Sequence, residues 1–185
     1  MERRSQKTRF DAVESGEEKY IEGYFVVFGS RYDIAPGVYE TVEPSAFDGV
    51  LERDDVRALN DHDSRLVLGR TSAGTLELRL DEKGLWGRIH INRQDTEAMN
   101  LYYRVQRGDI DQCSFGFDAE ESTDYQNGEI HNSIRRITRL YEVSVVTFPA
   151  YEETSVTARS LRKRGVAQWK KHMIKRLERS RTLWH

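Results

Sequence analysis

The 185-residue chain has a single cysteine, no internal repeat, no low-complexity tract and no long apolar run. One cysteine, Cys113, excludes an internal disulfide framework and a cysteine-rich zinc site, and it suits a reducing compartment. A membrane-spanning helix needs about 20 consecutive apolar residues, so no membrane partner is expected. The first residues are followed by no apolar segment, which argues against a secretory signal. These absences predict a soluble, cytoplasmic protein.

Charged residues make up 32% of the chain, and their signs are unevenly distributed. From Arg159 to the C-terminus there are ten Lys or Arg residues and one acidic residue, a net charge of +9. Residues 1–158 hold 19 basic and 30 acidic residues, a net charge of −11. The basic segment also has apolar residues at spacings of three and four, which predicts an amphipathic helix whose apolar stripe needs a partner. We therefore expect an acidic body that carries a basic, partner-binding tail.

The composition divides the chain into three parts. Residues 1–19 are polar with few apolar groups, which predicts a flexible arm. Residues 20–158 carry the apolar patterns of one domain, and residues 159–185 form the basic tail. The length is sufficient for one domain with a real hydrophobic core and short appendages.

Within the domain, the patterns favour strands. β-forming residues are dense from Tyr20 to Phe28, alternation recurs along residues 75–91, and residues 130–146 predict one long strand or two short ones. One helix is predicted over residues 96–106, ended by Gly108, and residues 119–128 are expected to be an acidic loop. The interpretation is an α+β, mainly β fold: a β-barrel or closed sheet with helices around it.

Ser114 lies in a stretch that alternates as a strand should. Cys113, Phe115 and Phe117 share the apolar face, which leaves Ser114 and Gly116 on the other. A serine in this position is either a solvated residue or, where a base and oxyanion donors are at hand, a nucleophile.

Three histidines in the domain are candidate bases. His62 occurs where a strand gives way to a polar turn, a position at which functional side chains are often exposed, although a surface histidine among charges has the same pattern. His90 alternates with apolar neighbours as an ordinary outward residue, and His131 borders the acidic stretch. Since His62 has no second histidine or cysteine at a ligand-like spacing, we expect no metal and no other cofactor.

Glu142 interrupts an apolar strand. A carboxylate there is costly unless it has a partner, and an exposed strand face or an ion pair with Arg135, Arg136 or Arg139 would account for it as well as a functional role would.

Taken in order, several stretches resemble the prohead (procapsid maturation) protease family of tailed bacteriophages. They are IEGYFVVFG (21–29), VEPSAF (42–47), NDHD through LGR (60–70), SFGF (114–117) and EVSVVTFPA (142–150). That family in turn resembles the herpesvirus maturational protease, assemblin, which implies a closed β-barrel surrounded by helices. The resemblance implies a catalytic set with Ser114 as nucleophile and His62 as general base. Glu142 occupies the place where the herpesvirus enzymes have a second histidine, and a carboxylate can orient an imidazole equally well.

The resemblance further implies a serine endopeptidase domain at residues 20–158. Such an enzyme would act in the host cytoplasm inside the assembling prohead, cutting the major capsid protein or its scaffold segment, and itself. The partners expected are these capsid and scaffold proteins, with a homo-oligomer left open and no nucleic acid, because the body is acidic. The alternative is a non-enzymatic scaffold or capsid-interaction protein that works through its basic tail.

Overall fold

The structure, a computed structural model, describes residues 1–7 and 10–148. Strands dominate this part of the chain, and the only α-helices in it are α1 and α2. The elements are β1 (Glu2–Lys7), β2 (Phe10–Ser15), β3 (Glu18–Val27), β4 (Tyr32–Ala35), β5 (Val38–Val42), the 3₁₀ turn η1 (Pro44–Phe47), α1 (Val50–Arg53), β6 (Arg57–Asn60), β7 (Asp63–Arg70), the 3₁₀ turn η2 (Thr71–Ala73), β8 (Leu76–Leu80), β9 (Gly84–His90), α2 (Thr96–Arg107), β10 (Gln112–Gln126) and β11 (Glu129–Val146).

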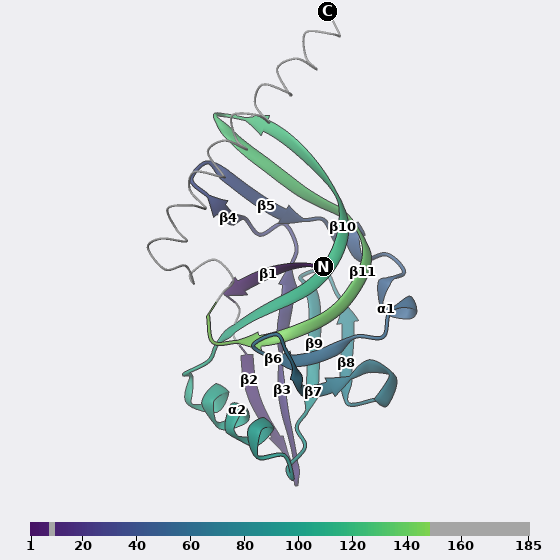
Figure 1. The fold of residues 1–185 in the computed structure, drawn as a ribbon, viewed down its shortest axis with the longest axis vertical. Coiled ribbons are helices and arrows are strands. Elements are labelled where there is room, and N and C mark those ends of the chain that lie inside the picture. Colours follow the sequence, from purple (N-terminus) through teal and green to yellow (C-terminus); the bar gives the residue numbers. More distant parts are fainter. Residues whose placement is uncertain (8–9, 149–185) are drawn as a thin grey trace, which may run out of the picture.

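Strands β10 and β11 form a long antiparallel hairpin in the middle of the larger, seven-stranded sheet (Figure 1). Its turn is Asn127-Gly128, where both residues have positive φ (51° and 84°), as the hairpin turn with matching twist requires. The sheet runs β1-β10-β11-β5-β4, and β6 and β7 branch from the second half of β11. The acidic residues 119–126, expected to be a loop, belong to β10; their partner across the sheet is the first half of β11.

The smaller sheet has four strands in the order β2-β3-β9-β8. One apolar cluster connects the two sheets: Phe25, Leu85 and Ile89 of the smaller sheet belong to the same buried core as Phe115 and Val143 of the larger one. The two sheets are therefore stabilised by a shared core, and β10 contributes one face to it.

Helix α2 begins and ends as its sequence predicts. The Asp95 carboxylate accepts from the backbone N–H groups of Glu97 and Ala98, and Gly108 ends the helix with φ of 84°. Its buried residues, which include Leu101 and Tyr102, pack into the core beside β2 (Figure 1).

The prediction of a closed barrel surrounded by helices is wrong. The described strands form two separate sheets, and the path of the larger one ends at β1 and at β4. The physical reason lies in β11, which pairs in parallel with β5 along residues 130–134 and with β6 along residues 142–145. Because the first half of β11 pairs with β5 and its second half pairs with β6, the sheet branches at β11.

The N-terminal segment, expected to be a flexible arm, contains β1 and β2. Residues 2–7 pair with residues 112–117 of β10, and residues 10–15 pair with β3. β1 has no apolar residue, so backbone pairing and the ion pair of Arg4 with Glu40 hold it, whereas Phe10 and Ala12 of β2 pack on the core. The basic tail at 159–185 lies outside the described residues. Within the described part, no helix is long and apolar enough to cross a membrane.

Candidate active site

Ser114 is held on the face of β10 that points away from the shared core. Its neighbour Cys113 faces the smaller sheet, where its thiol donates to the carbonyl oxygens of Tyr24 (3.4 Å) and Phe25 (3.5 Å). Alternation along the strand therefore directs Ser114 to the opposite side. The side chain is nevertheless fully buried, and its hydroxyl donates to the carbonyl oxygen of Arg4 on β1 at 2.9 Å.

His62 is presented by a two-residue turn between β6 and β7. Asp61 and His62 both have positive φ (49° and 59°), and the flanking Asn60 and Asp63 pair with each other. The Asp61 carboxylate fixes this turn to the end of β11, accepting from the backbone N–H of Thr147 (2.7 Å) and from its hydroxyl (2.9 Å). Two non-glycine residues in the left-handed region cost free energy, and such strain persists only where surrounding contacts hold it.

Glu142 reaches His62 from β11. Its Oε1 lies 2.6 Å from His62 Nδ1, and its Oε2 accepts from the Ser144 hydroxyl at 2.5 Å. Both oxygens of this buried carboxylate therefore have a hydrogen-bond partner, as a buried charge requires. The nearest cation is the Arg3 guanidinium at 3.9 Å, and the carboxylate does not pair with Arg135 or Arg136, which contact Glu43 and Glu120 instead.

A register shift beside Gly116 sets the position of Glu142. Gly116 pairs with Glu142, but Phe117 pairs with Leu140, so that Tyr141 is an extra residue in β11. A Cβ atom at Gly116 would lie 2.5 Å from Glu142 Oε1 and 3.1 Å from its Cγ. The absence of a side chain at residue 116 therefore makes room for the carboxylate that holds His62.

The free nitrogen of His62 is ready to act as a base. An ionised carboxylate only accepts hydrogen bonds, so the proton of the neutral ring resides on Nδ1 and Nε2 keeps its lone pair. His62 Nε2 is buried and has no hydrogen-bond partner among the residues that the structure describes. A base oriented through its far nitrogen is the arrangement that proton abstraction from a serine hydroxyl needs.

The structure gives the other candidate histidines different surroundings. His90 Nε2 contacts Glu77 at 2.7 Å on the smaller sheet, and His131 Nε2 contacts the Thr41 hydroxyl at 2.8 Å. His131 pairs with Asp124, ten residues along β10 from Ser114. Among the residues that the structure describes, neither histidine is hydrogen-bonded to Ser114 or Glu142; His62 contacts Glu142, and the hydroxyl of Ser114 donates to Arg4 rather than to His62.

The residues around His62 do not form a cation site. Asp61 is engaged by Thr147, and Asp63 by Arg65, whose hydrogen bonds lower the Asp63 pKa to about 2. Over residues 1–7 and 10–148, no group of three or more acidic, histidine or cysteine side chains is arranged to hold a metal ion.

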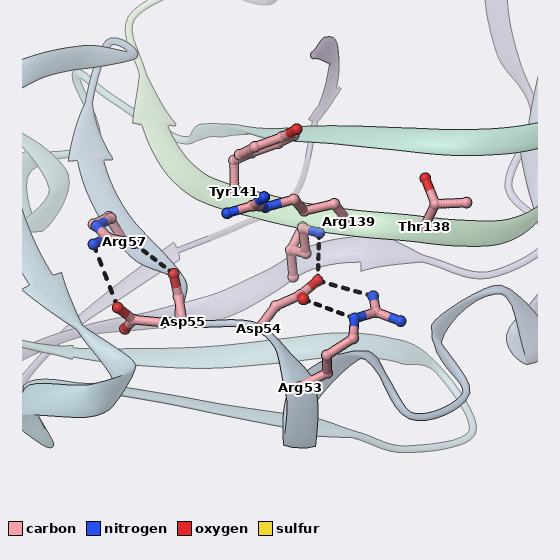
Figure 2. A pocket seen from close by; sticks show the side chains of 8 residues that line it. Arg53, Asp54, Asp55, Arg57, Thr138, Arg139 and Tyr141 are labelled. Atoms are coloured by element: carbon pink, nitrogen blue, oxygen red, sulfur yellow. Dashed lines mark hydrogen bonds and ion pairs between the residues drawn. The ribbon is translucent and has the colours of Figure 1, made fainter.

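A charged hollow of about 570 Å³ lies elsewhere, between α1 and β11 (Figure 2). Within the hollow, Arg53 contacts Asp54 at 2.8 Å and Arg57 contacts Asp55 at 3.3 Å, and the Arg139 guanidinium lies 4.9 Å from the centre of the Tyr141 ring. The Arg53 hydrogen bond lowers the pKa of Asp54, which keeps that carboxylate ionised. The hydroxyls of Thr138 and Tyr141 line this hollow, but no histidine does, and the Tyr141 hydroxyl donates to Asp118 at 2.6 Å; the candidate site is therefore the one around Ser114, His62 and Glu142.

Sequence reasoning did not find three parts of this site. Asp61 and Ser144 carry no local signal of a role, and β1 lies in the segment whose composition predicts a flexible arm. One available signal was Gly116, because a glycine inside a strand often marks the close approach of another group. The other was the pair of polar residues at 61–62 between two short strands, which is typical of a tight hairpin turn.

Comparisons with known proteins show the family and a similar fold. The family profile described as the caudovirus prohead serine protease matches residues 6–171. The prohead protease of Enterobacteria phage HK97 is 26% identical over 155 residues, covering 82% of this chain and 65% of that protein, so the chain spans less than two thirds of its relative's length. The structure of the bacteriophage T4 capsid assembly protease is similar in fold, with a TM-score of 0.51 at 15% identity, covering 80% of this chain and 96% of that one.

Proposed function

Because the chain belongs to the caudovirus prohead serine protease family, we propose that it is a serine endopeptidase of phage capsid maturation. The observation that carries the proposal is the contact between His62 Nδ1 and Glu142 at 2.6 Å, which leaves Nε2 buried and without a hydrogen-bond partner among the described residues. The family supports the reaction class, the contact supports distinct roles for His62 and Glu142, and the position of Ser114 on β10 makes it the proposed nucleophile.

In the proposed mechanism, Ser114 is the nucleophile and His62 the general base. The Ser114 hydroxyl turns from the Arg4 carbonyl towards His62 Nε2, which takes its proton as the oxygen attacks the substrate carbonyl carbon. Glu142 holds the ring through Nδ1 and stabilises the imidazolium that forms; Ser144 fixes the carboxylate in turn. His62 then returns the proton to the leaving amine, and water hydrolyses the acyl-enzyme by the same route.

The experiment is covalent labelling of the purified protein with a fluorophosphonate, followed by mass spectrometry to locate the label. We expect the label on Ser114, and no label or self-digestion in Ser114→Ala, with a far-UV spectrum like that of the original protein. Ser122→Ala is the matched control, since Ser122 lies on the same strand and its hydroxyl has no hydrogen-bond partner in the described structure. Equal proteolysis by Ser114→Ala would contradict the serine-protease mechanism.

The substrates proposed are the major capsid protein with its scaffold segment, and the chain itself, cut inside the assembling prohead in the host cytoplasm. The relatives named for proheads and capsid assembly support this setting. A non-enzymatic scaffold or capsid-interaction protein remains the competing function. A scaffold function does not require the buried Ser114 or the contact between His62 and Glu142, and it predicts no labelling at Ser114.

Recruitment into the prohead is proposed to depend on the basic tail. Its net charge of +9 is opposite in sign to that of residues 1–158, so it favours an acidic or amphipathic segment of a capsid or scaffold protein. We expect a chain ending at residue 159 to cleave a short peptide normally but to enter particles less efficiently, measured by its abundance in purified proheads. Equal abundance of the truncated and complete chains would place recruitment in the body.

A further inference from the structure

Strand β1 lies along the edge of β10 (Figure 1) and pairs with residues 112–117 of it, which include Ser114. The strands are antiparallel, with Arg4 opposite Phe115 and Ser5 opposite Ser114. The Ser114 hydroxyl contacts the carbonyl oxygen of Arg4 at 2.9 Å, and the carbonyl carbon is one bond of about 1.23 Å from that oxygen. The Ser114 hydroxyl therefore lies next to the peptide bond between Arg4 and Ser5, at the oxygen of its carbonyl group.

The side chain of Arg4 occupies a prepared acidic site. Its Nε and Nη2 donate to the two carboxylate oxygens of Glu40, at 2.5 and 3.0 Å, and its guanidinium lies 5.5 Å from the centre of the Phe117 ring. Glu40 comes from β5 and is fully buried; Glu121 contributes a further carboxylate at 3.5 Å. The guanidinium thus donates two hydrogen bonds to the planar carboxylate of Glu40 on β5.

Burial raises the pKa of Glu40, and the hydrogen bonds from Arg4 oppose that rise. Among the described residues, Arg4 donates both hydrogen bonds that the Glu40 carboxylate accepts. A carboxylate so deeply buried is costly unless a cation is bound to it, so an empty site would favour another basic side chain. The site selects arginine over lysine because only a guanidinium matches both oxygens at once.

β1 is also suited to be exchanged for another peptide. It is the terminal strand of the sheet path, and its sequence ERRSQK has no apolar residue to anchor it in the core. Addition of an extended peptide to a free sheet edge is a common mode of recognition, in which backbone hydrogen bonds give affinity and side-chain sites give specificity.

We propose that the edge of β10 beside Ser114 is the site for the substrate strand, that Glu40 makes the enzyme specific for arginine immediately before the cleaved bond, and that β1 is its first occupant, cleaved between Arg4 and Ser5. The inference rests on the proposed serine-protease function and adds the substrate class. Ser114 Oγ attacks the Arg4 carbonyl carbon, the bond to the Ser5 nitrogen breaks as His62 protonates that amine, and one water molecule hydrolyses the resulting ester.

The first test is the N-terminus of the purified full-length protein, read by intact mass and N-terminal sequencing. We expect a new terminus at Ser5, absent from Ser114→Ala and strongly reduced in Arg4→Gln. Lys7→Gln is the matched control, because it removes one positive charge from the same strand at a residue other than Arg4, and it should retain cleavage before Ser5. A terminus elsewhere, or equal cleavage of the Arg4→Gln protein, would overturn the assignment.

The second test uses peptides with the sequence of residues 1–10 and Arg, Lys or Gln at the fourth position. We expect kcat/KM to fall by about 10²-fold from Arg to Gln, with Lys between them, because the buried carboxylate loses its charged partner. Glu40→Gln should reduce the ratio of Arg to Gln cleavage towards one, measured on the same peptides alongside the thermal unfolding midpoint. An unchanged ratio in a folded Glu40→Gln protein would overturn the role of Glu40.

These outcomes separate the inference from the function on which it rests. If Ser114 is labelled by the fluorophosphonate but the peptides are cut after other residues or not at all, the proposed arginine specificity is wrong, while the proposed serine-protease function still holds. If Ser114 takes no label and neither the chain nor any peptide is cut, the proposed function itself fails.

Discussion

The pair of His62 and Glu142 shows how much of the candidate chemistry depends on single atoms. Glu142 Oε1 fixes the ring through Nδ1, Ser144 holds Oε2, and the missing side chain of Gly116 keeps the carboxylate in place. Each contact restricts Glu142 to one orientation. The imidazole is thus oriented before any substrate binds, so that binding energy is not needed to order it.

Glu142→Gln is expected to preserve the fold and to slow proteolysis. A neutral amide can still contact Nδ1 but does not stabilise the imidazolium, so we expect kcat/KM to fall roughly 10⁴-fold, against roughly 10⁶-fold for Ser114→Ala or His62→Ala. Peptide cleavage measured alongside the circular dichroism spectrum checks both parts. A Glu142→Gln enzyme of full activity would remove Glu142 from the mechanism.

At the scale of elements, the hairpin turn that carries His62 depends on contacts outside itself. Asp61 and His62 adopt left-handed backbone conformations, and the Asp61 carboxylate ties them to Thr147 at the end of β11. The same strand carries Glu142, so one element positions both members of the pair.

Replacing Asp61 should therefore affect activity without touching a reacting group. Asp61→Ala loses both hydrogen bonds to Thr147 in a left-handed position, and we expect about 1–3 kcal/mol of lost stability together with lower kcat/KM. Asp61→Asn is the matched variant, because asparagine tolerates positive φ and its amide oxygen still accepts from the Thr147 N–H. Thermal unfolding and peptide cleavage measure the two effects; equal behaviour of the two variants would contradict a positioning role.

The elements that could be predicted from sequence are those with local signals. The alternation around Ser114, the Asp95 and Gly108 ends of α2 and the Asn127-Gly128 turn follow from neighbouring residues alone. β1 could not be found in this way, because its polar residues resemble a disordered arm and its stability comes from pairing with residues more than a hundred positions away.

The site was predictable only in part for the same reason. Residue chemistry made Ser114, His62 and Glu142 candidates, but it left a surface histidine and an arginine ion pair as equal alternatives. The family resemblance selects the set, whereas both the strand pattern and the resemblance predict a closed barrel, which is wrong. The extra residue at Tyr141 and the parallel pairing of β11 with β6 depend on long-range strand pairing, which local patterns do not encode.

At the scale of the whole molecule, the two sheets are connected through one core, and the sole cysteine lies at their junction. Cys113 is fully buried, with its thiol directed at two carbonyl groups of β3. A reagent can reach this sulfur only when β10 and β3 separate. Since Phe25 and Phe115 belong to the same cluster, that separation exposes the core of both sheets.

We therefore expect a thiol reagent such as DTNB to modify the native protein slowly, through opening of the whole domain. The free energy of opening derived from the labelling rate should equal the free energy of unfolding from a denaturant titration, which for single domains is about 5–15 kcal/mol. Labelling in denaturant, where one thiol per chain should react at once, is the control. Labelling with an opening free energy well below that of unfolding would show that the two sheets separate without global unfolding, and that the core is not one cooperative unit.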